Sequence, residues 1–117
     1  MHDPTEGGLV NGIVEVAMAS EKEIEVDLEK VHIYRESRIL CDAYGLNPLG
    51  VIASGALLLT ISPSDLPTLQ RAFHRASIPV QVIGRVKKGK ARVLVMEGNG
   101  RKELEPFSRD EILKIFK

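Results

Sequence analysis

The chain has 117 residues, enough for one domain with a single hydrophobic core, and 44% of them are apolar. Sixteen acidic and sixteen basic residues cancel, so no net field draws the chain toward nucleic acid or a membrane surface. A single cysteine, Cys41, excludes an intramolecular disulfide and is typical of a reducing cytoplasm.

Charge is distributed unevenly along the chain. Residues 1–31 carry eight acids and two bases, whereas residues 71–92 carry seven bases and no acid. The first residues lack the basic segment and apolar core of a signal peptide. The uncharged stretch 47–64 is broken by two prolines and two glycines, and its apolar part is too short to cross a bilayer. These features predict a cytoplasmic protein without membrane contact.

Helical spacing of apolar residues predicts an amphipathic helix over roughly residues 5–20, with an apolar stripe of Val10, Ile13, Val14, Ala17 and Met18. Alternating apolar and acidic residues then predict a half-exposed strand over 23–31, with its glutamates facing outward. A second helix is predicted over 33–44 and ends at Gly45. Its inward-facing residues are expected to be Leu40, Ala43 and Tyr44.

The apolar run ALLLTI at 56–61 predicts a central strand buried on both faces. A third helix is predicted over 64–76, with Pro67 tolerated in its first turn. Its apolar stripe is Leu66, Leu69, Phe73 and Ala76. Residues 80–86 and 91–97 predict two strands, which the turn KKGK joins as a hairpin.

Residues 98–100 turn the chain into a short edge segment at 101–107, and Ser108 with Glu111 predicts a capping box for a last helix. The inward residues of that helix are expected to be Ile112, Ile115 and Phe116. The element order predicts an α/β (α+β) fold, in which helices pack on a mixed sheet that partly resembles a split βαβ arrangement. The whole chain, 1–117, is expected to form one domain.

The opening string HDPTEGG lies directly before the first predicted helix. Asp3 as N-cap, Pro4 at the first helical position and Glu6 three residues later are sufficient for an ordinary helix start. They do not explain Gly7 and Gly8, because each glycine in a first turn costs up to about 1 kcal/mol relative to alanine. Two adjacent glycines indicate that backbone or a ligand approaches closely.

A phosphate-bearing ligand is one candidate for that approach. The free N–H groups at a helix N-terminus attract anions, and His2 and Thr5 would add side-chain donors. The string is not a Walker loop, and no strand precedes it as a dinucleotide fingerprint requires.

The string HDPTEGGL, followed by an amphipathic helix, resembles the start of the C-terminal domain of the aminoimidazole ribonucleotide (AIR) synthase-related superfamily. The hydrogenase expression/formation branch, a carbamoyl dehydratase, is the most similar. CDAYGLNPLGVIASGALLLTI resembles the family's helix, Gly-Leu-Asp-Pro-Leu, loop and strand, and VIGRV resembles its Ile-Gly-x-Val strand. The resemblance runs from residue 2 to about residue 95.

The resemblance implies a domain that lines a substrate and phosphate cleft of an ATP-dependent enzyme. An N-terminal ATP-binding domain would be missing from this chain and would be its partner. ATP and Mg²⁺ are expected cofactors of the whole protein but not of this chain alone. The implied substrate is a small molecule or a carbamoyl-type compound, and a homodimer is expected. The residues that the resemblance assigns to this cleft are His2, Asp3, Thr5, Gly7, Gly8, Ser54 and Gly55.

Ser54 and Gly55 depart from the Asn-Glu-Gly usual in the hydrogenase branch and are more similar to selenophosphate synthetases. Around them, Asn47-Pro48 and Gly55 also fit plain turn chemistry. The chain's end departs as well: the branch ends in Pro-Arg-Ile-Cys, whose cysteine accepts the carbamoyl group, whereas Phe116 stands there in the closing residues 113–117. Without that sulfur the covalent step has no carrier.

The remaining candidates favour structural roles. Cys41 is expected to be a small core residue. The spacing of His2, His32 and His74 fits no metal site. The basic turn has no aromatic residue beside it for base stacking, so nucleic-acid binding is disfavoured. A standalone interaction module without catalysis is the main alternative, and an RNA-binding module is the weakest.

Overall fold

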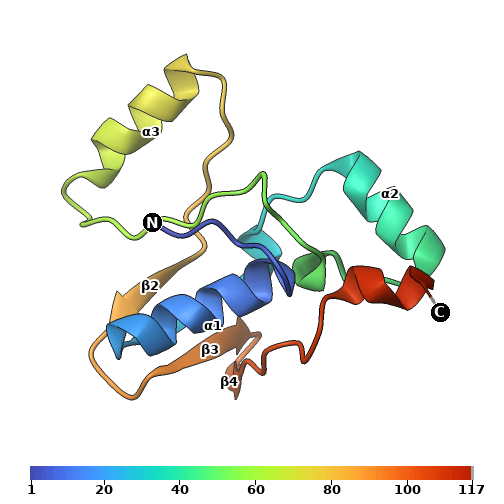
Figure 1. The fold of residues 1–117 in the computed structure, drawn as a ribbon. Coiled ribbons are helices and arrows are strands. Elements are labelled where there is room, and N and C mark those ends of the chain that lie inside the picture. Colours follow the sequence, from blue (N-terminus) through green and yellow to red (C-terminus); the bar gives the residue numbers. More distant parts are fainter. Residues whose placement is uncertain (117) are drawn as a thin grey trace.

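Four short strands form one mixed sheet with the order β2-β1-β3-β4 in the computed structural model, which describes residues 1–116 (Figure 1). The strands are β1 (Glu23–Val26), β2 (Gly84–Lys87), β3 (Arg92–Glu97) and β4 (Gly100–Glu103). β1 is antiparallel to β2 and parallel to β3, and β4 is antiparallel to β3. The predicted mixed sheet with helices is therefore confirmed.

Helix α1 (Gly8–Ser20) covers one face of this sheet and forms the core with it (Figure 1). Since Ile24 pairs with Val93 and Val26 with Val95, these four side chains share the face toward α1. Ile13 and Ala17 meet them from the helix and are almost completely buried. The periodicity of residues 5–20 thus predicted the correct inner stripe, although Met18 at its end is exposed.

Two further α-helices and three 3₁₀ helices complete the described elements. They are α2 (Arg35–Tyr44), α3 (Leu66–Arg75) and the 3₁₀ helices η1 (Leu28–Lys30), η2 (Pro48–Gly50) and η3 (Glu111–Phe116). α3 has no buried residue, and its stripe is at most half-buried. On α2, only Cys41 is buried, whereas Leu40 and Tyr44 were predicted to face inward and are exposed. No helix among residues 1–116 is long and apolar enough to cross a membrane.

The predicted hairpin is wrong, because β1 lies between β2 and β3. Local alternation and a glycine turn do not distinguish a tight hairpin from a connection that steps over one strand. Two strand spacings amount to about 10 Å, a distance that the four residues 88–91 span easily. Pairing of β1 with both strands, across 58 to 69 residues of sequence, decides the arrangement.

The predicted central strand at 56–61 is also wrong. Only an isolated antiparallel bridge between His2 and Leu58 forms there, and Leu57 and Ile61 are 53% and 42% exposed. No described strand lies beside this segment to complete a ladder. Ser108 likewise does not begin an α-helix: η3 starts at Glu111 and leaves Phe116 exposed, so its predicted inward position is wrong. Lys117 lies outside the described residues.

Glu25 was predicted on an exposed face but is 8% exposed, because β1 is central and basic side chains from β2 and β4 lie over it. Lys87 Nζ lies 2.7 Å and Arg101 Nη1 3.3 Å from Glu25 Oε1. The hydrogen bond from Lys87 is the main cause that holds the pKa of Glu25 below its ordinary 4.5, and it outweighs burial, which acts in the opposite direction.

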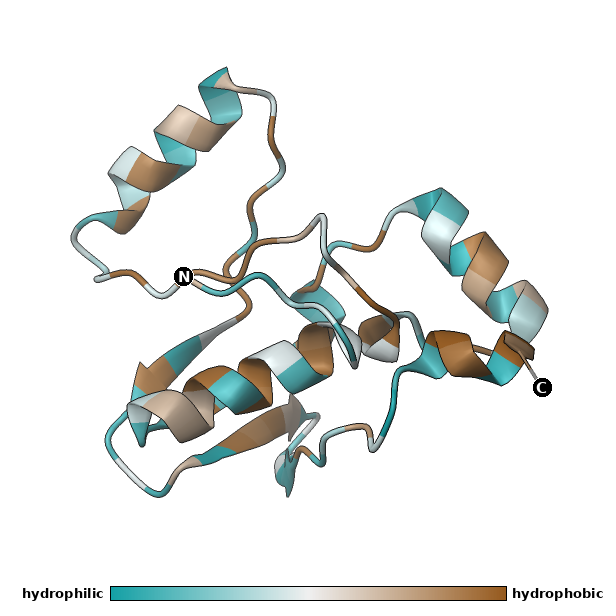
Figure 2. Ribbon diagram, in the orientation of Figure 1, coloured by the Kyte–Doolittle hydropathy of each residue, from teal (hydrophilic) through white to brown (hydrophobic). Residues whose placement is uncertain are grey.

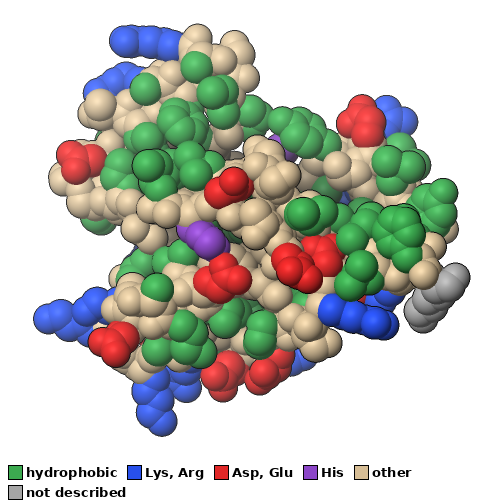
Figure 3. Space-filling view, in the orientation of Figure 1, with side chains coloured by type: hydrophobic (Ala, Val, Ile, Leu, Met, Phe, Trp, Pro, Cys, Tyr) green, Lys and Arg blue, Asp and Glu red, His purple; other side chains and the backbone are tan. Residues whose placement is uncertain are grey.

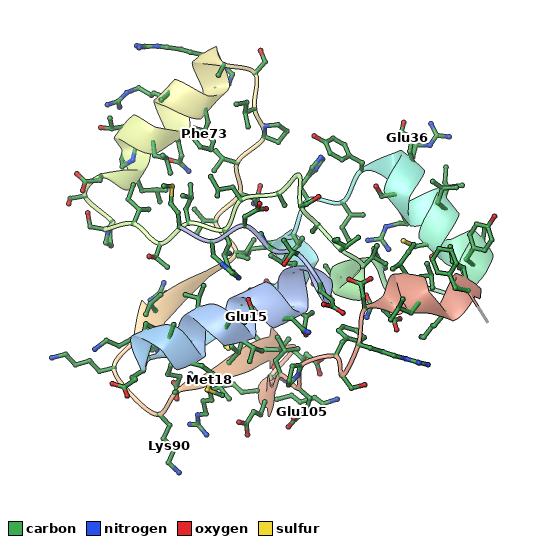
Figure 4. All side chains as sticks on the ribbon, in the orientation of Figure 1. Glu15, Met18, Glu36, Phe73, Lys90 and Glu105 are labelled. Carbon is green, nitrogen blue, oxygen red and sulfur yellow. The ribbon has the colours of Figure 1, made fainter. Side chains whose placement is uncertain are left out.

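Acidification is expected to weaken the fold through Glu25. A carboxyl whose pKa is lowered in the folded state stabilises the protein above its unfolded pKa, and this contribution is lost as the pH falls through the folded pKa. Glu25→Gln should therefore reduce the difference between urea midpoints measured at about pH 6 and about pH 3.5. Glu105→Gln, at an exposed position after β4 (Figure 4), is the matched control and should leave that difference unchanged.

Candidate functional site

The opening loop, residues 2–8, crosses α1 and meets the segment after η2. The backbone of His2 exchanges two hydrogen bonds with Leu58, each 2.8 Å long. Its side chain turns to α1, where Nε2 lies 2.6 Å from Glu15 Oε2. Both side chains are partly exposed, so the pair lies at the surface beside a shallow hollow lined by Met1, His2, Glu15, Val16, Ala19 and Ser20.

The first helix starts differently from the prediction. α1 begins at Gly8, and the N-cap is Gly7 in the left-handed region (φ 83°), with no side-chain cap. Asp3 is exposed and does not cap the helix, and Pro4 is buried in front of it. Gly8 N donates to Thr5 O at 3.0 Å, which closes a turn ahead of the helix. The predicted capping roles of Asp3, Pro4 and Glu6 are therefore wrong.

A carboxylate from the other end of the chain occupies the helix mouth. Asp110 Oδ2 accepts the hydrogen of Gly7 N at 2.7 Å, and Asp110 Oδ1 accepts that of Ile112 N at 3.0 Å. Asp110 is 4% exposed. An anionic group thus does bind this N–H, as helix N-termini favour. It belongs to the protein itself.

Asn11 fastens the same C-terminal segment to α1. Its Nδ2 donates to Phe107 O at 3.0 Å, and Phe107 N donates to its Oδ1 at 2.8 Å. Together with Asp110, this two-way amide contact ties the start of α1 to residues 107–112. Sequence reasoning missed Asn11, Phe107 and Asp110, and no local signal joins positions 96 to 103 residues apart.

Close packing accounts for the two glycines, against backbone atoms at Gly8 and against a side chain at Gly7. A Cβ on Gly8 (φ 68°) would lie 2.5 Å from Val51 O and 2.6 Å from Leu49 O. A Cβ on Gly7 would overlap the side chain of Asn11. Of the two explanations that the sequence left open, the structure shows backbone approach at Gly8.

The η2 turn is held against this loop by a second buried carboxylate. Glu111 Oε1 accepts from Asn47 N at 3.0 Å and from Lys114 Nζ at 2.9 Å. The Lys114 hydrogen bond is the leading cause of the lowered pKa of Glu111, and it acts against burial. Asn47 Oδ1 also accepts from Leu49 N at 3.0 Å, which confirms the predicted turn chemistry.

Ser54 and Gly55 are exposed on the segment that leads to Leu58. No hydrogen bond of the described residues joins them to the opening loop, and neither lines the hollow beside His2. Gly7 and Gly8 are buried at the start of α1 and His2 pairs with Leu58, whereas Asp3, Thr5 and Ser54 are exposed. A ligand at these residues stays a prediction, and Gly7 N–H does not serve it in this conformation.

Residues 1–116 were expected not to bind ATP and Mg²⁺ without a further domain, and this stays a prediction. They contain no group of three His, Cys, Asp or Glu side chains arranged to hold a metal ion. The buried N–H of Gly7 already has a carboxylate partner, and that of Gly8 donates to Thr5 O. Cys41 is also unsuited to carry an acyl group, because it is 8% exposed and burial raises the pKa of its thiol.

Known proteins are similar to this chain in both sequence and fold. Residues 1–97 match the family described as AIR synthase related protein, C-terminal domain. A Methanocaldococcus jannaschii protein named for hydrogenase expression/formation is 26% identical over 117 residues, covering 98% of this chain and 35% of that protein. Carbamoyl dehydratase HypE of Rhizobium leguminosarum bv. viciae is 31% identical over 74 residues, covering 63% and 21%. The chain thus spans about a third or less of these relatives.

Solved structures of hydrogenase maturation proteins share the fold. Escherichia coli HypE superposes with a TM-score of 0.78 at 24% identity, covering 97% of this chain and 36% of that chain. HypE in complex with ATP gives 0.77 at 22% identity, covering 91% and 35%. The family match covers 97 of the 117 residues, so the chain belongs to the AIR synthase related protein, C-terminal domain family.

Proposed function

We propose that this chain is the substrate- and phosphate-cleft domain of a two-domain, ATP-dependent enzyme of the hydrogenase-maturation type. The family match over residues 1–97, with relatives named for hydrogenase expression/formation and carbamoyl dehydration, carries the proposal. A preceding domain would supply the nucleotide and Mg²⁺ site. We place the whole enzyme in the cytoplasm, as a homodimer acting on a small or carbamoyl-type substrate.

An incompletely covered apolar surface supports a missing domain. Between η2 and β2 the chain exposes large hydrophobic side chains to 42–53%, and Figure 2 shows hydrophobic residues along this stretch and α3. Figure 3 shows hydrophobic side chains gathered over the same part of the molecule. Contiguous exposed apolar patches mark interaction surfaces. The residues are Ile52, Leu57, Ile61, Ile78 and Val82.

In this proposal, the cleft is lined by exposed groups of the opening loop and by residues 54–55. Phosphoryl transfer depends on positioning and on neutralising charge more than on covalent chemistry by the protein. In the proposal, His2 and Thr5 donate to substrate or phosphate oxygens, and Asp3 binds a Mg²⁺-bridged group or positions substrate. Gly7 and Gly8 shape the loop, and Ser54 with Gly55 forms the opposite wall.

The proposal includes no carbamoyl carrier on these residues. Cys41 is the one cysteine of the printed sequence and is buried. Phe116, which is 73% exposed, stands at the place that the resemblance gives to the acceptor cysteine. We propose a hydrogenase-maturation-type paralogue in which residues 1–116 do not themselves carry the carbamoyl group.

Nucleotide binding tests the proposal. Isothermal titration of Mg²⁺-ATP is expected to show no binding to the 117-residue chain and clear binding to the same chain joined to the residues that its gene encodes upstream. In the joined protein, Asp3→Asn should lower ATP turnover at least about tenfold, since a charged contact to the reacting groups is lost. Glu36→Gln on α2, far from the loop (Figure 4), is the control.

Two outcomes would contradict the proposal. Steady ATP turnover by the purified 117-residue chain would show that it needs no second domain. An upstream-extended protein that binds no nucleotide, while remaining folded by circular dichroism, would favour the alternative of a standalone interaction module, for which the exposed apolar surface is the supporting observation.

A further inference from the structure

The segment Leu57–Ile61 is a strand edge that is paired at one point only. His2 and Leu58 exchange both of their backbone hydrogen bonds, which is the bonded pair of an antiparallel ladder. In such a ladder the bonded pairs recur every second residue along each strand. The neighbouring pairs on the two sides of this bridge are therefore defined by the register.

The ladder is closed on one side and open on the other. Toward the helix, the next pair would join Pro4 to Ala56, but Pro4 has no N–H, and Ala56 N already donates to Ala53 O at 2.9 Å. In the other direction, Thr60 would face the residue two positions before His2. Among residues 1–116, neither the N–H nor the C=O of Thr60 has a backbone partner.

The open side has the properties of a strand edge to which a further strand can be added. Leu57 and Ile61 are 53% and 42% exposed, and the residues between them are apolar apart from Thr60. Pro63, which cannot donate, follows directly after Ser62 and limits the edge to a short pairing. In Figure 1 the N-terminus lies beside this green segment. Exposed, unpaired edges of this kind pair readily with an added strand.

We propose that Leu57–Ile61 pairs, antiparallel, with an extended segment that directly precedes His2 in a longer protein. The inference rests on the proposed function. It has its own support in the register, because a segment continuous with His2 is already aligned opposite Thr60. The matched family is described as a C-terminal domain, and the Methanocaldococcus relative is covered to only 35%, so relatives have ample chain to supply the strand.

Amide hydrogen exchange at Thr60 tests the pairing. In the 117-residue chain, the Thr60 amide should exchange at close to the rate of an open peptide. In the protein extended by its own upstream residues, it should exchange at least about tenfold more slowly, while the amide of Leu59, which points away from the new strand, should change little.

A proline substitution provides a second measurement. Thr60→Pro removes the N–H donor, so it should lower the Tm of the extended protein by several degrees and leave the Tm of the 117-residue chain unchanged. Thr60→Ala keeps the donor and is the control in both proteins. Equal effects of Thr60→Pro in the two proteins would show a purely local role and overturn the proposal.

Other results overturn it as well. Fast exchange of the Thr60 amide hydrogen in the extended protein would rule out the added strand. A gene product that begins at Met1 would rule it out as well. Protection in the 117-residue chain that rises with concentration would assign the edge to a second copy. If the extended protein binds Mg²⁺-ATP but leaves Thr60 unprotected, this inference fails alone; if Thr60 is protected but no nucleotide binds, the proposed function fails alone.

Discussion

Replacing Gly8 by alanine is expected to destabilise the chain by about 3 kcal/mol, the largest effect of any single methyl group added to the opening loop. A left-handed backbone costs a residue with a Cβ roughly 1–2 kcal/mol, and overpacking adds about 1–3 kcal/mol. The new Cβ would lie 2.5 Å from Val51 O and 2.6 Å from Leu49 O, two backbone atoms that have no rotamer to change. Urea unfolding followed by circular dichroism measures the loss.

Gly55→Ala is the matched control. Gly55 has no left-handed φ, and a Cβ there would meet nothing within 4 Å, so the stability should change by no more than about 0.5 kcal/mol. A stable Gly8→Ala variant would contradict the packing explanation and return the glycine to a ligand role. Loss of activity in Gly8→Ala alone does not identify an anion site, because the substitution also displaces the loop from η2.

Removal of the Asp110 carboxylate is expected to cost about 2–3 kcal/mol. Asp110→Ala leaves the buried N–H of Gly7 without its acceptor at 2.7 Å and also removes the bond to Ile112 N. Charge-assisted hydrogen bonds of this kind contribute about 1.5–3 kcal/mol, and an unsatisfied buried donor adds its own desolvation cost. The measurement is the free energy of unfolding in urea.

Two variants separate this bond from general effects of charge. Asp110→Asn keeps an acceptor oxygen and should retain at least half of the stability that the alanine variant loses. Glu105→Ala removes a negative charge from an exposed position of the same segment (Figure 4) and should change the stability by less than about 0.5 kcal/mol. An equal loss in Glu105→Ala and Asp110→Ala would show that net charge, rather than the Gly7 bond, is responsible.

These two substitutions probe one unit from both sides. Gly8 packs on η2, while Gly7 is bound by Asp110 and Asn11 is bound by the backbone of Phe107. The start of α1, the η2 turn and residues 107–112 therefore hold one another. Family membership rests on residues 1–97, yet the shape of their opening loop depends on a carboxylate beyond that range.

Local patterns in the sequence were sufficient for most elements. The 3.6-residue spacing of Val10, Ile13 and Ala17 predicted the buried stripe of α1, and all three are buried. The alternation of Ile24 and Val26 predicted the inner face of β1, which is confirmed by the pairing of these residues with Val93 and Val95. Such patterns are reliable because each records which side of its own element avoids water.

The same patterns failed where an element needed a neighbour that the local sequence does not specify. ALLLTI has the composition of a buried strand, but it forms one bridge at Leu58 because no second strand among residues 1–116 lies along it. Leu40 and Tyr44 have the spacing of an inward stripe, but they are 60% and 63% exposed because little packs against α2. Apolar character predicts burial only when a partner surface is present.

The sequence by itself determined the α/β class, the positions of most helices and strands, and the family, through the string HDPTEGG and the motifs that follow it. Only the tertiary structure decided that β1 separates β2 from β3 and that Asp110 fills the mouth of α1. The physical reason is the sequence separation between the residues that are in contact. Helical and strand periodicities depend on neighbours within a few residues, whereas these two contacts join residues at least 58 positions apart and depend on how the whole chain closes.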